Sequence, residues 1–103
     1  MKLNPKQSKY LRKLGHSMSP TVIVADKGLT ENVVAAIDEA LEIHELIKVK
    51  VRQPKEQRKV TNQQICEKTN SYQAQTIGMI LLIYRPGKDP QISLPGPKLN
   101  HGS

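Results

Sequence analysis

The stretch HELIKVK, residues 44–50, decides the fold, because it predicts the point where a helix ends and a strand begins. Side chains alternate between the two faces of a strand. Lys48 and Lys50 therefore share one face, and the opposite face is apolar, with Ile47, Val49 and Val51. A strand that carries cations on one face and packs with the other predicts a surface for a polyanion.

The segment before this junction predicts two helices and a strand. Asn4 and Pro5 start a helix that runs to about Leu14, with Gly15 as its stop. A β-branched run over residues 21–24 predicts a strand, and Thr30 caps the helix that follows. Apolar residues recur at helical spacing in both helices, namely Tyr10, Leu11 and Leu14 in the first and Val33, Ile37, Ala40, Leu41 and His44 in the second.

The segment after the junction predicts one helix and two strands. The strand that begins in HELIKVK ends near Arg52, and a helix follows over about residues 55–69, with Asn70 as its left-handed cap. Its apolar stripe is thin and consists of Val60, Ile65 and Cys66. Two strands, residues 72–77 and 79–84, join around Gly78. The last reads MILLIY, so we expect both of its faces to be covered.

The element order is therefore α-β-α-β-α-β-β, an α/β fold. Strands separated by helices favour parallel crossovers, and the last two strands favour an antiparallel hairpin. We expect a four-stranded mixed sheet packed by helices, with the second and third helices on one face and the first on part of the other. A single domain over residues 1–94 is expected, with Ile92 and Leu94 docked locally and a flexible tail over residues 95–103.

Charge and composition narrow the partners. Sixteen Lys and Arg against nine Asp and Glu give a net charge of +7, which favours a partner that carries phosphates. No segment approaches the roughly 18 apolar residues of a membrane span, so we expect no membrane partner. The N-terminus has no apolar signal-peptide core, which together with the single cysteine favours a cytoplasmic setting, and we expect a monomer. The chain has one cysteine, which excludes an internal disulfide and a CxxC metal site. It has three tyrosines and no Phe or Trp, so a sheet that stacks bases on several aromatics is not expected.

No pattern of residues predicts catalysis. His16, His44 and His101 are far apart, and no metal-ligand spacing, nucleotide fingerprint or activated nucleophile is present. His44 fits a half-buried place on its helix, and Cys66 fits a small apolar side chain in the core. We therefore expect a protein that is not an enzyme and that needs no cofactor and no metal.

Three groups of residues are candidates for contact with phosphates. Lysines of the first helix step by three and four and share one face. The turn over residues 25–28 follows a strand and opens a helix, where backbone N–H groups and the helix dipole suit a phosphate. The third group lies on the strand of HELIKVK. In order, the groups are Lys6, Lys9 and Lys13; Ala25, Asp26, Lys27 and Gly28; and Lys48 and Lys50. The alternative for each group is an ordinary solvated surface or turn.

Three segments carry a resemblance to a known family: VADKGLT (residues 24–30), HELIKVKV (residues 44–51) and QTIGMILLIYRP (residues 75–86). Together they resemble the YhbY-type CRM domain, an RNA-binding module of chloroplast splicing and ribosome maturation factors, over about residues 3–94. The resemblance implies a fold similar to the C-terminal domain of bacterial translation initiation factor three. It also implies association with precursors of the large ribosomal subunit, and it adds Arg85, in the YRP ending, to the candidate RNA contacts.

The resemblance further implies a GxxG loop that holds RNA through its backbone, as in KH domains. Only the second glycine is present here, as Gly28; Ala25 replaces the first, and Asp26 follows where a basic residue is common. Because Asp26 repels phosphate, the loop is expected to hold RNA less closely or to bind through Lys27.

The leading hypothesis is an RNA-binding protein that acts on ribosomal RNA in precursors of the large subunit and assists their assembly. The alternative is a protein-interaction module that docks on a basic protein through the acidic second helix. The exposed side of that helix is expected to carry Glu31, Asp38, Glu39, Glu42 and Glu45 and to face away from a polyanion.

Overall fold

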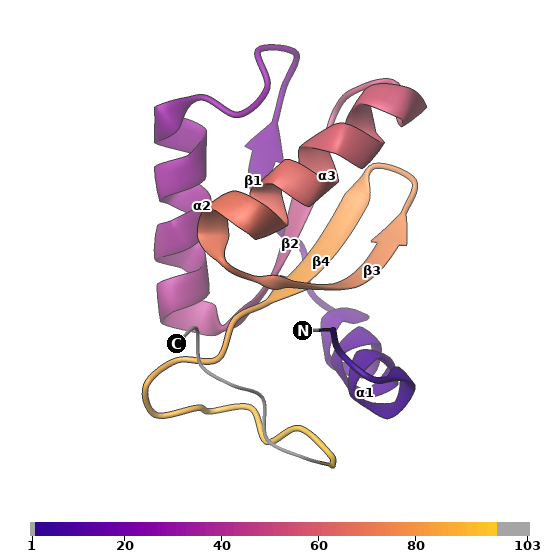
Figure 1. Cartoon of the computed structure of the whole chain (residues 1–103), viewed down its shortest axis with the longest axis vertical. Helices are drawn as coiled ribbons and strands as arrows, with labels where there is room; N and C mark the ends of the chain where they lie inside the picture. The colour runs from indigo at the N-terminus through magenta and orange to yellow at the C-terminus, as the bar shows by residue number, and fades with distance from the viewer. Residues whose placement is uncertain (1, 97–103) are drawn as a thin grey trace.

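A four-stranded mixed sheet forms the centre of the fold in a computed structural model that describes residues 2–96 (Figure 1). The elements follow the order α1 (Pro5–Gly15), β1 (Pro20–Val24), α2 (Glu31–His44), β2 (Leu46–Val51), α3 (Lys55–Thr69), β3 (Tyr72–Ile77) and β4 (Ile80–Tyr84). The strand order across the sheet is β1-β2-β4-β3. The β1–β2 pair is parallel, and β4 is antiparallel to both of its neighbours. The predicted fold class and order of elements are confirmed.

The sheet is covered on both faces, so the molecule has two cores. On one face α2 and α3 pack against the strands around Ile37, Ile47, Ile65 and Leu81, all fully buried. On the other face the smaller core contains Leu11 of α1 together with Leu46, Ala74, Leu82 and Tyr84. β4 contributes to both cores, as the doubly apolar MILLIY segment predicts.

The segment after β4 belongs to the second core. Ile92 and Leu94 pack against it, as expected, and the Pro95 carbonyl accepts a hydrogen bond from Gln7 Nε2 of α1 at 3.3 Å. The end of the folded unit at residue 94 stays a prediction. Residues 97–103 of the expected flexible tail lie outside the described residues.

The packing face of α1 differs from the predicted stripe of Tyr10, Leu11 and Leu14. Gln7, Leu11 and Gly15 are buried, whereas Leu14 is 37% exposed. Gly15 is not a left-handed stop, because the cap is His16 with φ −54°. A Cβ on Gly15 would lie 2.9 Å from both methyl groups of Leu82, so the glycine permits the close approach of α1 to β4.

The predicted stripe of α3 is also partly wrong. Val60 is 57% exposed, and the buried face consists of Thr61, Ile65 and Thr69. Thr61 donates a hydrogen bond to the buried side chain of Gln53, and Thr69 donates one to the Ile65 carbonyl. Threonine hydroxyls with local acceptors can be buried, which hydrophobic periodicity does not reveal.

The helix-to-strand junction bends at Glu45, which has φ 64°. Its side chain was expected on the exposed side of α2, and that expectation is wrong, because Glu45 is only 4% exposed. Its carboxylate accepts three backbone hydrogen bonds, from Gly87 at 2.7 Å, Gln91 at 2.9 Å and Ile92 at 3.0 Å. The residue that turns the chain into β2 therefore also fastens the C-terminal segment to the sheet.

Candidate nucleic-acid interface

A groove of about 760 Å³ runs between α1 and the sheet. Five of the residues that line it are lysines or arginines, and no described residue of its wall is acidic. The wall brings together the three lysine candidates of α1 and Lys48, but not Lys50, with further residues from α1, β3 and the C-terminal segment. The full lining is Lys6, Lys9, Tyr10, Arg12, Lys13, His16, Lys48, Gln75, Ile77 and Pro95. A hollow whose charged residues are all cationic suits an anionic chain.

The packing of α1 directs its lysines into this groove. The Asn4 side chain caps the helix by accepting a hydrogen bond from the Gln7 backbone N–H at 2.8 Å, and Gln7 Oε1 accepts one from the Asn4 backbone N–H at 3.0 Å. This capping box fixes the start of the helix. Because Leu11 and Gly15 face the sheet, the lysines at positions 6, 9 and 13 lie on the exposed sides of the helix.

Lys48 lies on the sheet side of the groove. It is half-buried, and its Nζ donates a hydrogen bond to the Met18 carbonyl at 3.0 Å. Lys48 does not pair with the nearby Glu45, whose carboxylate accepts hydrogen bonds from backbone amides instead. The bond to Met18 holds the Lys48 ammonium at the groove without neutralising its charge.

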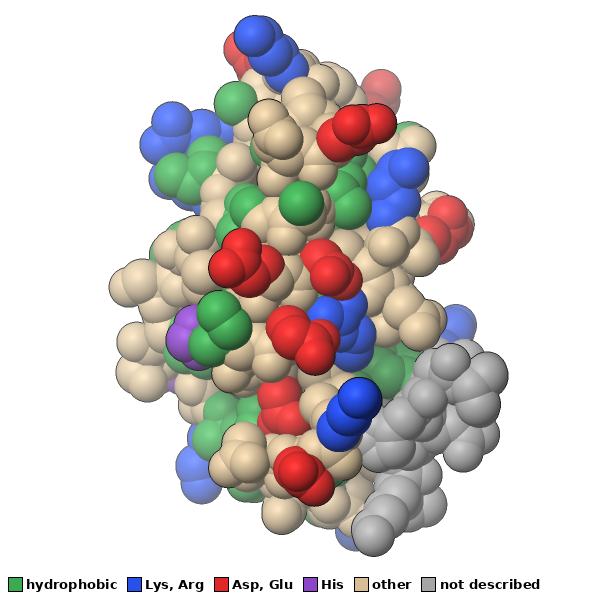
Figure 2. Space-filling view, turned by 90° about the vertical axis from the view of Figure 1, so that its left-hand side faces the viewer, with side chains coloured by type: hydrophobic (Ala, Val, Ile, Leu, Met, Phe, Trp, Pro, Cys, Tyr) green, Lys and Arg blue, Asp and Glu red, His purple; other side chains and the backbone are tan. Residues whose placement is uncertain are grey.

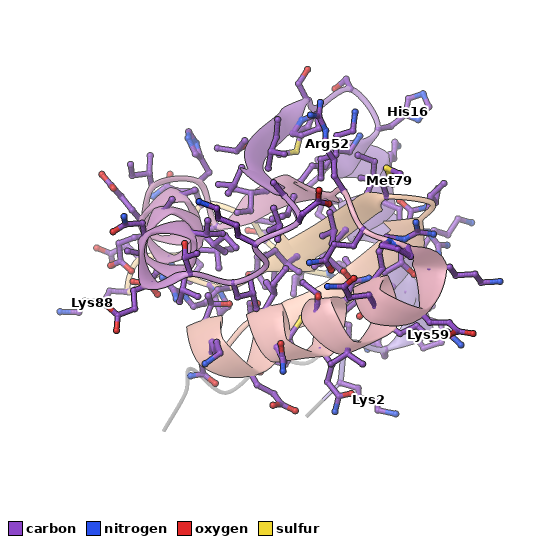
Figure 3. All side chains as sticks on the ribbon, turned by 90° about the horizontal axis from the view of Figure 1, so that it is seen from above. Lys2, His16, Arg52, Lys59, Met79 and Lys88 are labelled. Carbon is purple, nitrogen blue, oxygen red and sulfur yellow. The ribbon has the colours of Figure 1, made fainter. Side chains whose placement is uncertain are left out.

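Lys50 and Arg52 continue the cationic face of β2 beyond the groove. Lys50 is two residues after Lys48 and half-buried, and Arg52 is exposed just after the end of the strand. Figure 3 labels Arg52 and His16 on the side of the sheet away from α3. At about 3.3 Å per residue, Lys48 and Arg52 lie about 13 Å apart along the strand.

The turn over residues 25–28 lies beside Arg52, at the end of β2. The Gly28 amide donates to the Ala25 carbonyl at 2.9 Å, and Gly28 has φ 74°, a conformation that favours glycine. Thr30 caps α2 by accepting a bond from the Val33 amide at 3.2 Å. Arg52 donates its backbone N–H to the Val24 carbonyl at 2.8 Å, which joins the two segments. The groove, the β2 cations and the turn therefore follow one another along one side of the molecule.

A buried donor lies beneath the turn. Gln53 is 3% exposed, and its Nε2 has no hydrogen-bond partner among residues 2–96. The position of a Cβ on Gly28 would be 3.7 Å from that nitrogen. An unpaired buried amide is costly, and this one leaves a free donor beside the turn that no described residue satisfies.

Arg85 lies apart from this path. Its guanidinium donates to the Asp38 carboxylate at 2.6 Å, to Glu42 at 3.1 Å and to the Thr69 carbonyl at 2.8 Å, and its side chain is 17% exposed. These bonds tie β4 to α2 and α3. The geometry favours a structural role for Arg85 over the RNA contact that the resemblance implies.

Acidic side chains gather on the face over α2 (Figure 2). Glu39 and Glu42 are exposed on this helix, and Ile43 beside them is 65% exposed. The groove and the β2 cations lie on the other side of the sheet from α2. The acidic helix therefore faces away from the basic strand face, as predicted.

The other candidates for chemistry occupy ordinary structural positions. His44 is exposed, so the expected half-buried position is wrong. Cys66 packs against the larger core, and burial raises the pKa of its thiol. Among residues 2–96, no three His, Cys, Asp or Glu side chains gather as metal ligands, and no helix is long and apolar enough to cross a membrane.

The candidate contacts predicted from the sequence did not include three basic residues of this surface. Two of them line the groove, Arg12 and His16, and the third, Arg52, follows β2. Arg12 and His16 were visible as neighbours of the lysine face, and Arg52 continues the alternation of Lys48 and Lys50. The role of Glu45 had no comparable signal, since its partners lie more than 40 residues later.

Comparison with known proteins finds relatives whose sequences match most of the chain. The CRS1 / YhbY (CRM) domain matches residues 3–85. A protein named RNA-binding protein from Haemophilus influenzae is 44% identical over 94 residues, which cover 90% of this chain and 95% of that protein. A probable RNA-binding protein from Pseudomonas aeruginosa is 38% identical over 95 residues, 91% of each chain. A solution structure from Staphylococcus aureus, of a hypothetical protein described as a candidate RNA-binding protein, has a TM-score of 0.80 at 39% identity and covers 90% of this chain and 99% of its own.

Proposed function

The chain belongs to the CRS1/YhbY (CRM) domain family, and on that premise we propose that it is an RNA-binding protein without catalytic activity. Its substrate is ribosomal RNA in precursors of the large ribosomal subunit, whose assembly it assists. In this proposal the chain acts as a cytoplasmic monomer. The names of its relatives support RNA as the partner.

One observation carries the proposal: the groove beside α1 is lined by five cations and no carboxylate among the described residues. Phosphate contacts supply most of the affinity of proteins for nucleic acids. Lysines from α1 and Lys48 would hold one part of the RNA backbone. Lys50, Arg52 and the turn with Lys27 extend the path, so an RNA strand of several nucleotides can be followed along it.

The mechanism is electrostatic. Each lysine or arginine that neutralises a phosphate releases condensed counterions, which makes binding salt-dependent. Backbone amides at the start of α2 add a favourable dipole at the turn. Asp26 opposes phosphate there, so the lysines carry more of the binding than the turn does.

A salt series tests the proposal. Filter binding of the chain to a fragment of ribosomal RNA should weaken as salt rises, and about five phosphate contacts with a single strand predict a log–log slope near −3.5. The double charge reversal Lys48→Glu with Lys50→Glu should abolish association with ribosomal precursor particles. A control at a distant site is Lys88→Glu, an exposed cation that Figure 3 labels on the side of α2, far from His16. A flat salt response, or an equal loss in the control, would contradict the proposal.

The acidic face over α2 supports a second candidate, docking on a basic protein. Exposed Ile43 directly follows Glu42 in the chain, and Glu39 is one helical turn earlier, so charge and apolar surface occur together. Under this candidate, reversing Glu39 and Glu42 should remove particle association, and reversing Lys48 and Lys50 should leave it intact. Since Glu42 also pairs with Arg85, the single change Glu39→Lys is the cleaner variant.

A further inference from the structure

Four side chains form a row across the whole sheet. The strand register pairs Ile23 of β1 with Lys50 of β2, Lys50 with Ile80 of β4, and Ile80 with Ile77 of β3. Residues directly opposite one another in a sheet point to the same face. Ile23, Lys50, Ile80 and Ile77 therefore stand side by side on one surface.

This surface is the part of the sheet that α1 leaves open. Leu82, two residues from Ile80, packs on Leu11 and Gly15 of α1, so the row lies on the α1 side of the sheet. Ile23 is 48% exposed and Ile77 is 63% exposed, whereas Ile80 and Lys50 are half-buried. In Figure 3, Met79 next to the row is labelled on the side away from α3. Two exposed isoleucines and one half-buried isoleucine thus form an apolar row at the surface, and such a row indicates an interaction surface.

The row is continuous with the cationic groove. Ile77 lines the groove, and Lys48 of the groove precedes Lys50 of the row by two residues. None of the described residues that line the groove or form the row is acidic. The occupant must therefore be anionic and must also present apolar surface beside its charges.

We propose that this row seats unpaired bases of a single-stranded RNA segment whose phosphates bind the lysines of the groove. The inference rests on the proposed function and specifies its substrate as unpaired RNA. An unpaired strand offers both base faces and phosphates, whereas a duplex keeps its base faces stacked inside. The row spans three inter-strand distances, about 14 Å, which gives room for about two bases.

The side-chain types in the row determine which forms of RNA it can distinguish. Its aliphatic side chains have no hydrogen-bonding groups, and Lys50 is the one polar side chain among the four. Contact with base faces therefore removes apolar surface from water without reading the base identity. The row distinguishes paired from unpaired RNA and tolerates many sequences.

The test compares one oligoribonucleotide as a single strand and as a duplex, bound to the intact chain and to the double variant Ile23→Thr with Ile77→Thr. Threonine keeps the β-branched shape that strands favour, so the sheet should be retained, which circular dichroism and a thermal melt check. The single strand should bind the variant about fivefold more weakly, equivalent to roughly 40 Å² of apolar surface. Duplex binding and the salt slope should not change. Ile43→Thr on α2, at 65% exposure, is the matched control and should bind as the unaltered chain does.

Two outcomes separate this inference from the proposed function. Suppose that the row variant binds the single strand as well as the unaltered chain does, while Lys48→Glu with Lys50→Glu weakens binding. The proposed contact between the row and unpaired bases is then wrong, and the proposed RNA binding is retained. If the row variant loses the same factor in affinity for the single strand and for the duplex, the proposed contact with unpaired bases is also wrong. If the unaltered chain binds neither form, both proposals fail, and loss of a protein partner in the row variant would then assign the row to protein docking.

Discussion

Replacing Glu45, the residue that caps the C-terminal end of α2, by glutamine should weaken the attachment of the C-terminal segment. One carboxylate oxygen of Glu45 accepts from the Gly87 amide at 2.7 Å, and the other accepts from Gln91 and Ile92. A glutamine has one acceptor oxygen, so its NH₂ group must face at least one amide donor. The exchange thus removes a charge-assisted bond and sets two donors against each other.

The magnitude follows from these contacts. A hydrogen bond to a charged group contributes about 1.5–3 kcal/mol, and a buried donor without an acceptor costs about 1–3 kcal/mol. We expect Glu45→Gln to lower the free energy of unfolding by about 2–4 kcal/mol, a large part of the stability of a small domain. The segment can undock and satisfy its amides with water, which keeps the loss at the lower end of the simple sum.

Amide hydrogen exchange and urea unfolding measure the two parts of this prediction. Exchange at Gly87, Gln91 and Ile92 should accelerate in Glu45→Gln, while amides of β2 and β4 lose protection only with global stability. Glu39→Gln, on the exposed side of α2, should change stability by no more than about 0.5 kcal/mol. Unchanged protection of the three amides, with a urea midpoint equal to that of the control, would refute the assignment of Glu45 as the clamp of this segment.

Three further changes test other parts of the structure. Asp26→Lys removes the acidic side chain at the turn and should tighten RNA binding severalfold and steepen the log–log salt slope by about 0.7, measured by filter binding; an unchanged slope would place the turn outside the interface. Arg85→Gln breaks bonds to α2 and α3 and should lower stability in urea by about 1–3 kcal/mol without changing that slope, whereas a changed slope would assign it to the RNA contact. Burial, with the charges of nearby carboxylate and phenol groups, raises the pKa of Tyr84 to about 12, so stability present below pH 10 should fall as pH rises from 10 to 12, and Tyr84→Phe should lack that part of the fall.

The sequence predicted the sheet well because its strands carry strong period-two patterns. Ile47, Val49 and Val51 alternate with lysines, and the observed β2 keeps those faces. The MILLIY run predicted a strand buried on both sides, and β4 contributes to both cores. The helices were located correctly, but their buried faces in α1 and α3 were not, since Gln7, Gly15 and Thr61 are buried through specific contacts rather than through hydrophobicity.

The candidate site was predicted as separate pieces. Lysines of α1 and β2 could be named from periodicity, but their meeting in one groove depends on how closely α1 approaches β4 at Gly15. Arg85 shows the opposite case. It resembles a free cation in the sequence, and the fold surrounds it with two carboxylates and a carbonyl.

By itself, the sequence determined the order of the elements, the two faces of β2 and the excess of positive charge, because each of these depends on residues near one another in the chain. Only the tertiary structure decided which cations share a surface, which are neutralised and which strand positions stay open to solvent. Those properties depend on contacts between residues far apart in the chain, such as Lys48 with Met18, Arg85 with Asp38, and Glu45 with Ile92. The HELIKVK stretch shows both cases. The alternation of side chains is enough to place its two lysines on one face of the strand, whereas the role of Glu45 depends on its contacts with residues 87, 91 and 92 in the folded chain.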